Sequence, residues 1–135
     1  MLLIETYINI SPGRGFGLFA KTNLIVGTKY WVRNEIFDKI LLPEELNLLA
    51  PIASDYFTKY GFLERTGCWY LCGDNARFSN HSPVPNTQNH FSTSGLLEYC
   101  TISKDINIGE EIFIDYTNIC LTCKDGVNFS EEIIL

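Results

Sequence analysis

The chain has 135 residues, of which 46% are hydrophobic and 19% are charged. This length and composition suit one globular domain with one core and leave too little chain for a second. The formal net charge of −6 argues against nucleic acid as the main partner, because phosphate binding needs clustered Lys and Arg side chains. An acidic balance suits a basic protein partner through electrostatic steering, and it also serves ordinary solubility.

The sequence predicts neither a membrane span nor a secretory leader. No run of about 18 apolar residues occurs, and the first residues lack a basic stretch followed by a long apolar one. Five cysteines at irregular spacing favour free thiols in a reducing compartment over a disulfide framework. We therefore expect an intracellular protein without a membrane partner. Its compartment would be the cytoplasm, or the nucleus if the protein is eukaryotic or acts in a host cell.

The first third of the chain predicts short strands. Leu2–Ile10 is rich in β-branched and aromatic residues. Phe16–Lys21 follows two glycines, and Lys29–Val32 follows a turn at Gly27. Each segment is short, which favours several small sheets.

The range 43–60 is the best helix candidate. Acidic residues directly after Pro43 suit the first turn of a helix, and apolar residues then recur at helical spacing. Pro51 should break or kink this helix near Ala50, and Gly61 should end it.

The second half of the chain predicts further strands around a long loop. Cys68–Cys72, Leu96–Ile102 and Glu111–Tyr116 have strand-like composition, whereas Gly73–Asn89 is rich in loop-forming residues. Many short strands with one helical insert indicate an α+β, mostly β domain built from small sheets, and not an alternating βαβ arrangement.

Two segments carry the clearest functional information. Residues 77–86 read Arg-Phe-Ser-Asn-His-Ser-Pro-Val-Pro-Asn, a polar run followed by prolines that suits neither a helix interior nor a central strand. Residues 109–116 form a glycine turn and a buried strand that ends at Tyr116. A polar loop and a strand-end tyrosine are parts from which a small-molecule pocket can be built.

These two segments resemble the signature of the SET-domain methyltransferases. The family pattern Arg-Phe-x-Asn-His-Ser-x-x-Pro-Asn is matched over 77–86, and Gly-Glu-Glu-x-x-x-Asp-Tyr over 109–116. Residues 14–20, Arg-Gly-Phe-Gly-Leu-Phe-Ala, resemble the glycine motif of the family. A lone Gly-x-Gly is weak, but three motifs in the family's order bracket most of the chain.

The resemblance implies a fold and an activity. The fold would be a single SET-like domain over residues 1–135, a cluster of small sheets with one helical insert and a knot-like C-terminal segment, a threading that ordinary connection rules would not propose. The activity would be methyl transfer from S-adenosyl-L-methionine to a lysine side chain of a protein. The substrate would be histone-like or another basic protein, without direct contact to nucleic acid, and a homodimer is compatible with this reading.

The resemblance also assigns cofactor residues. Glycines allow the backbone to approach a ligand closely, and the family uses the side chain of the Asn-His-Ser asparagine together with nearby backbone groups. The alternatives are a simple turn at the glycine motif and a loop held by its own side chains. The implied cofactor-binding residues are Arg14, Gly15, Phe16, Gly17, Asn80 and His81.

Tyr116 is the implied catalytic residue, because its hydroxyl could orient the target amine and stabilise shifting charge. Tyr70 is the second candidate, as an aromatic wall that attracts the amine through a cation–π contact. Trp69 or Tyr30 could serve equally as this wall, and core packing is the alternative for all three.

The sequence departs from the family at several positions. Many relatives carry a cysteine where Pro83 stands, with three more after the tyrosine. Here the tail offers only Cys120 and Cys123, so we expect no zinc site of the family type. Residues 118–135 would have to cover the lysine channel, with Phe129, Ile133 and Ile134 as candidate lid residues. Ile114 replaces the Phe or Tyr of many relatives, which leaves the number of transferred methyl groups open, leaning toward more than one.

Three other functions remain open at this point. A catalytically silent SET-like protein-binding module would keep the fold without turnover. A small metal or redox protein would use Cys120 and Cys123, although no strand-to-helix junction surrounds that pair. A cysteine hydrolase is the weakest alternative, because no cysteine lies in a recognisable nucleophile motif.

Overall fold

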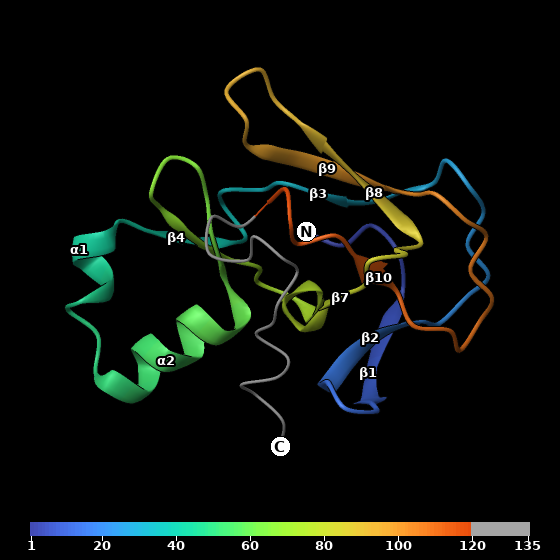
Figure 1. Cartoon of the computed structure of the whole chain (residues 1–135), viewed down its shortest axis with the longest axis horizontal. Helices are drawn as coiled ribbons and strands as arrows, with labels where there is room; N and C mark the ends of the chain where they lie inside the picture. Colours follow the sequence, from blue (N-terminus) through green and yellow to red (C-terminus); the bar gives the residue numbers. More distant parts are fainter. Residues whose placement is uncertain (120–135) are drawn as a thin grey trace.

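The computed structural model describes residues 1–119 of the chain (Figure 1). Its regular elements are short and are distributed over four small sheets and two helices. In chain order they are β1 (Thr6–Ser11), β2 (Gly15–Ala20), β3 (Lys29–Val32), β4 (Lys39–Leu41), α1 (Pro43–Leu46), α2 (Pro51–Tyr60), β5 (Phe62–Leu63), β6 (Trp69–Leu71), the 3₁₀ turn η1 (Asn75–Phe78), β7 (Asn80–His81), β8 (Thr87–Phe91), β9 (Leu97–Ile102) and β10 (Phe113–Ile114).

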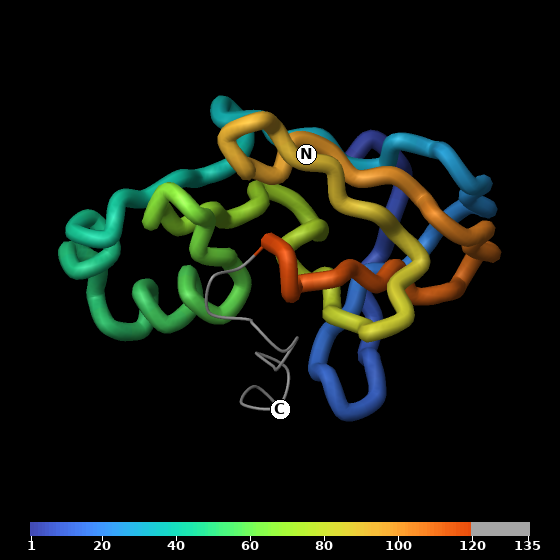
Figure 2. The backbone as a smooth tube through the Cα atoms, turned by 45° about the horizontal axis from the view of Figure 1, so that its top comes forward, coloured from blue at the N-terminus to red at the C-terminus, as the bar shows by residue number. Residues whose placement is uncertain are grey.

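The four sheets are separate and small. β1 and β2 form an antiparallel hairpin with Thr6 opposite Ala20. β9 lies between β3 and β8 in one three-stranded sheet, and β6 lies between β4 and β5 in another. β7 and β10 form a two-stranded parallel pair. The helices lie at the left of the molecule and the β1–β2 hairpin protrudes at the bottom (Figures 1 and 2), and β7 and β10 lie above the hairpin in Figure 1.

The β3–β9 pairing is irregular at one point. Lys29 pairs with Thr101 and Trp31 with Cys100, so the register shifts across Tyr30 in the manner of a β-bulge. Neighbouring side chains of a regular strand point to opposite faces. Here both Tyr30 and Trp31 are buried. The irregularity thus directs two successive aromatic residues into the interior.

The helical insert is interrupted as proline chemistry dictates. α1 begins at Pro43 and α2 at Pro51, each proline occupying the start of a helix where its missing N–H is not needed. α2 ends at Gly61, where an added Cβ would lie 2.6 Å from the Phe57 oxygen and 2.8 Å from the Tyr70 oxygen. Glycine at this position therefore lets the end of α2 pack directly against β6.

The main core lies between the small sheets. It combines Leu18 of β2, Tyr70 of β6 and Ile102 of β9 with Ile106 and Ile112 from the chain before β10, all nearly fully buried. A smaller cluster joins the helices to β4 and β6. Its members are Leu41, Phe57 and Leu71.

Polar side chains hold the segment 111–115 in place. The Asn86 amide donates to the Glu111 oxygen and its carbonyl accepts from the Phe113 N–H, at 2.9 and 2.8 Å. Thr87 donates to the Phe113 oxygen and Asn89 to the Asp115 oxygen. These side chains supply hydrogen bonds that a two-residue strand cannot obtain from its ladder alone.

The expectation of an α+β, mostly β fold built from small sheets is confirmed. The helical range 43–60 is divided at Pro51 as expected. Four strands were not expected: β4, β5, β7 and β8. The first strand is shorter than the expected range Leu2–Ile10. Within residues 1–119, no helix is long and apolar enough to cross a membrane. Of the expected C-terminal segment 118–135, residues 120–135, which include the expected lid residues, lie outside the described residues.

Candidate active site

Asn80 connects three parts of the chain. Its Nδ2 donates to the Phe16 oxygen of β2 and to Glu111 Oε2, both at 2.9 Å. The other carboxylate oxygen of Glu111 accepts from Ser11 Oγ at 2.7 Å. Glu111 also bridges to Phe19 of β2. The Asn-His-Ser segment, the glycine motif and the Gly-Glu-Glu segment, far apart in the sequence, are thereby joined at one carboxylate.

Gly17 allows this junction to form. A Cβ at this position would lie 2.6 Å from Glu111 Oε2 and 3.1 Å from the Cβ of Ser11. Both distances are shorter than ordinary van der Waals contact. The second glycine of the motif is therefore required by the Glu111 carboxylate that crosses over it.

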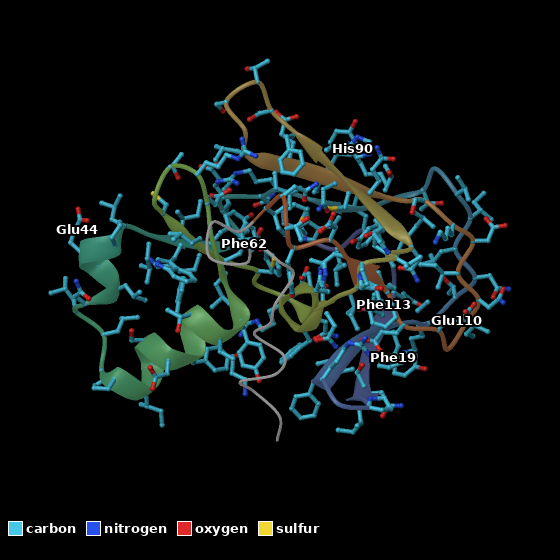
Figure 3. All side chains as sticks on the ribbon, in the orientation of Figure 1. Phe19, Glu44, Phe62, His90, Glu110 and Phe113 are labelled. Atoms are coloured by element: carbon cyan, nitrogen blue, oxygen red, sulfur yellow. The ribbon has the colours of Figure 1, made fainter. Side chains whose placement is uncertain are left out.

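Alternate residues of β10 contact different surroundings. The Arg14 guanidinium lies over the Phe113 ring, 5.2 Å from its centroid. The next residue, Ile114, lines a cavity together with Tyr116. Because successive strand residues point to opposite faces, β10 separates the side of the glycine motif from the side of this cavity. Figure 3 marks Phe113 close to β10 in the middle of the molecule.

Tyr116 is held by the segment 79–81. Its hydroxyl donates to the Ser79 oxygen, and its backbone N–H donates to His81 Nδ1 at 3.0 Å. The two rings stack, with centroids 6.0 Å apart and an interplanar angle of 19°. The strand-end tyrosine and the Asn-His-Ser segment therefore form one unit.

His81 is suited to accept this hydrogen bond. Burial lowers the pKa of its imidazole below the usual value of 6.5; Arg14 acts in the same direction and Asp115 opposes it. The imidazole is therefore neutral at pH 7, which leaves Nδ1 free of a proton when Nε2 carries it. The negative side chain of Asp115 lies 3.9 Å from Nδ1.

The cavity beside Tyr116 is mostly aromatic and aliphatic, with a volume of about 40 Å³. Its lining residues come from three of the sheets, the end of α2 and the turns between them, and Figure 3 marks one of them, Phe62. Those used below are Trp31, Phe62, Leu97, Ile114 and Tyr116.

Tyr70 lies behind this cavity. It is fully buried, its ring stacks on Phe62 at 5.2 Å and meets Trp31 edge-on at 6.1 Å. Its hydroxyl donates to Asp38 Oδ2, and burial, followed by this bond, raises its pKa well above the usual range. Tyr70 is not among the described residues that line the cavity beside Tyr116, although both belong to or pack against the same core cluster.

Arg77 supports the loop that carries Asn80. Its guanidinium donates to the Cys72 oxygen through Nε and Nη2, at 3.0 and 2.8 Å, and to the Tyr56 hydroxyl at 2.5 Å. Phe78 packs edge-on against Phe16 and Tyr60. These contacts fasten the 3₁₀ turn between β6 and α2.

Two of the described cysteines are poor nucleophiles. Burial raises the pKa of Cys100 to about 12 and that of Cys72 still further. A thiol reacts as its thiolate, so both are inert at neutral pH. Within the described range no three His, Cys, Asp or Glu side chains are grouped to hold a metal ion. Cys120 and Cys123 lie outside that range.

A family model for the SET domain matches residues 15–117. The chain belongs to the SET-domain family. None of the curated proteins matches the sequence. The three motifs that suggested the family thus lie within, or at the edge of, the matched part of this SET domain.

Several solved structures share the fold. Chaetomium thermophilum Polycomb Repressive Complex 2 bound to GSK126 matches with a TM-score of 0.65 and 23% identity over 90% of this chain and 17% of that chain. The Neurospora SET domain protein DIM-5, a histone lysine methyltransferase, matches with a TM-score of 0.59 and 21% sequence identity. The match covers 87% of this chain and 54% of the Neurospora chain. A Plasmodium falciparum candidate histone methyltransferase matches with a TM-score of 0.57 and 18% sequence identity. The match covers 85% of this chain and 95% of the Plasmodium chain. This SET domain therefore spans about half of the Neurospora protein and a small part of the Chaetomium chain.

Sequence reasoning missed several members of the site. Glu111 was quoted in a motif without a role, although a glutamate beside a glycine turn could have been paired with Asn80. Trp31 was placed within the expected strand Lys29–Val32, without a role of its own beyond that. Phe62 and Leu97 carry no local signal, because apolar residues in short strands look alike wherever they face.

Proposed function

We propose that this SET domain is a protein-lysine N-methyltransferase that uses S-adenosyl-L-methionine. The observation that carries the proposal is the two-sided arrangement around β7 and β10. Arg14 and the Asn80 junction lie toward the glycine motif, whereas Ile114 and Tyr116 line the apolar cavity. A transfer in which donor and acceptor approach from opposite sides needs such a partition.

The side of the glycine motif fits the cofactor chemically. Among the described residues no donor contacts the amide oxygen of Asn80, and no carboxylate pairs with Arg14. An acceptor and a cation suit the ammonium and carboxylate groups of an amino acid. Gly15, Phe16 and Gly17 would contribute backbone groups, and His81 its backbone. When bound, S-adenosyl-L-methionine supplies an electrophilic methyl group.

The cavity fits the side chain of a lysine. Its apolar wall disfavours the ammonium form, which has no lone pair, and so favours the neutral amine. Tyr116 is the proposed catalytic residue: it lines the cavity, and its hydroxyl, which now donates to the Ser79 oxygen, would orient the amine. Tyr70 is a positioning residue, because it holds Trp31 and Phe62 from behind.

We infer a basic protein substrate, histones being one class. The net charge of −6 would attract such a partner, and the related Neurospora protein is a histone lysine methyltransferase. The test is incubation with methyl-labelled S-adenosyl-L-methionine and a panel of core histones and other basic proteins. Label on lysine supports the proposal. Binding of the basic proteins without binding of the cofactor would instead identify a silent binding module.

Gly17→Ala should weaken cofactor binding. The new methyl group would displace the Glu111 carboxylate and with it one partner of Asn80. We expect about a tenfold higher dissociation constant, which corresponds to the loss of about one hydrogen bond to a charged group. Calorimetric titration with S-adenosyl-L-methionine measures it. Gly67→Ala is the control. The positive φ of 88° at Gly67 makes an added side chain unfavourable there as well, but nothing lies within 4 Å of the added Cβ, and Gly67 is not part of this junction. Equal effects of the two changes would contradict the role of Gly17.

Acid should reduce activity through His81. Because the folded protein holds the His81 pKa below about 6.5, the imidazole gains its proton only at lower pH, and the Tyr116 N–H then loses its acceptor. We expect kcat/KM of the wild type to fall only at pH values below the ordinary imidazole value of about 6.5. His81→Asn keeps an acceptor that does not titrate, so its profile should lack this step. If kcat/KM of His81→Asn falls at low pH as it does in the wild type, the fall belongs to the titration of another group.

A further inference from the structure

One polar group in the cavity has no role in the proposed reaction. Trp31 is 3% exposed and lines the cavity with Phe62, Leu97 and Tyr116. Among the side-chain nitrogen and oxygen atoms of residues 1–119, its Nε1 is the buried atom without a hydrogen-bond partner. Leaving a buried donor unpaired is unfavourable, so a donor of this kind beside a cavity indicates that an acceptor occupies the cavity.

The indole is held firmly. The register shift across Tyr30 directs Trp31 inward, and Leu2 bridges to Trp31 from the other side. The Tyr70 ring meets the indole edge-on, and the Tyr70 hydroxyl is itself fixed by Asp38. A ring confined on several sides cannot easily turn to find another partner for its N–H.

The chemistry of the group restricts the occupant. An indole N–H only donates, and the neutral amine must keep its single lone pair for the methyl group, so the two do not bond directly during the transfer. Water can accept from both, and a volume of about 40 Å³ is enough for one molecule. The lining also includes the hydroxyls of Tyr60 and Tyr116, and the Tyr116 hydroxyl already donates to the Ser79 oxygen. Within residues 1–119, the Trp31 N–H has no such partner. A water that accepts from the indole keeps its remaining lone pair for the amine.

We propose that Trp31 Nε1 holds a water molecule that accepts an N–H of the target amine, which makes Trp31 a specificity-determining residue. This inference rests on the proposed function and extends it to the number of methyl groups. A neutral amine with no or one methyl group still has an N–H for the water, whereas a neutral dimethylamine has none. The cavity therefore favours the first two transfers and disfavours the third.

The direct test uses small amines and no turnover. The chain has two tryptophans, so Trp69→Phe leaves the Trp31 indole as the single indole resonance in a ¹H–¹⁵N spectrum. It is titrated at pH 7 with n-butylamine and its N-methyl, N,N-dimethyl and N,N,N-trimethyl derivatives. We expect the Trp31 resonance to shift with n-butylamine. We expect binding to be about fivefold weaker for the trimethyl cation, which cannot donate to the water.

Trp31→Phe supplies the second comparison. It keeps an aromatic ring and removes the N–H. The ratio between the affinities for n-butylamine and for its trimethyl derivative should therefore fall to about one. In turnover, the share of trimethylated product measured by mass spectrometry should rise. If Trp31→Phe does not fold, the titration of Trp69→Phe decides alone.

Two results would overturn the inference. One is a Trp31 resonance that no amine moves; the other is the same order of affinities in Trp31→Phe. Failure of the proposed function is a separate outcome, because amine selectivity without methyl transfer would leave the water site intact while removing the enzyme reading.

Discussion

Tyr116→Phe should abolish most methyl transfer while leaving cofactor binding intact. The change removes only the hydroxyl, which now bonds the Ser79 oxygen, and keeps the ring that stacks on His81. Removing one well-placed hydrogen-bonding group from an active site typically lowers kcat on the order of 100-fold. Transfer of labelled methyl to a basic protein measures the rate, and calorimetry with S-adenosyl-L-methionine measures binding.

Tyr99→Phe is the matched control for this experiment. Tyr99 lies on β9, where its ring stacks on His90 at 4.3 Å, and it is not among the described residues of the cavity. Its loss should leave the rate nearly unchanged. A Tyr116→Phe protein that folds, binds cofactor and turns over at the wild-type rate would exclude Tyr116 as the catalytic residue.

Asn80→Asp should damage both cofactor binding and stability. The amide nitrogen that lies 2.9 Å from Glu111 Oε2 would become a carboxylate oxygen. Two carboxylates at this distance cannot both stay ionised without a large penalty. We expect a stability loss of about 3 kcal/mol at pH 7 in urea unfolding, together with cofactor binding too weak to detect.

The pH dependence of this loss has a definite sign. One carboxyl of the pair would have its pKa raised in the folded state, above the unfolded values of about 3.9 and 4.3 for Asp and Glu. The folded protein would then bind more protons than the unfolded chain, so stability falls as pH rises. The difference from wild type should be small near pH 4 and full at neutral pH.

Glu111→Gln in the same chain supplies the rescue. The double variant Asn80→Asp with Glu111→Gln restores one donor and one acceptor across the 2.9 Å contact, so most of the lost stability should return. If the stability losses of the two single variants simply add in the double variant, the contact does not join the two segments as described.

The motif-bearing parts of the site were predictable, because they depend on local chemistry. Pro51 interrupts a helix and can start another. Gly15 and Gly17 indicate a turn before the strand that follows. The same holds for the polar run that carries Asn80 and His81, which cannot enter a helix. The family resemblance assigned Phe16 and Asn80 to one cofactor site, but the contacts of Asn80 with Phe16 and Glu111 were not predicted, because no local rule brings these three residues together.

The remaining features depend on tertiary contacts. β8 contains Gln88, Asn89 and His90, so its composition hides a strand that pairs with β9. The parallel pair of β7 and β10 has two residues on each strand, too few for a periodic pattern. The inward position of Trp31 follows from a register shift that only the pairing with β9 creates.

The way residues 111–115 are attached bears on how such a site can change over generations. The Ser82 N–H bonds the Ile114 oxygen, and Asn86 and Thr87 bond the backbone of Phe113. The position of residues 113 and 114 is therefore set by hydrogen bonds to their main-chain atoms, while the side chain of Ile114 lines the cavity. A mutation at 114 can alter what the cavity accepts without moving Tyr116. Selectivity can drift at this position while the catalytic geometry is inherited unchanged.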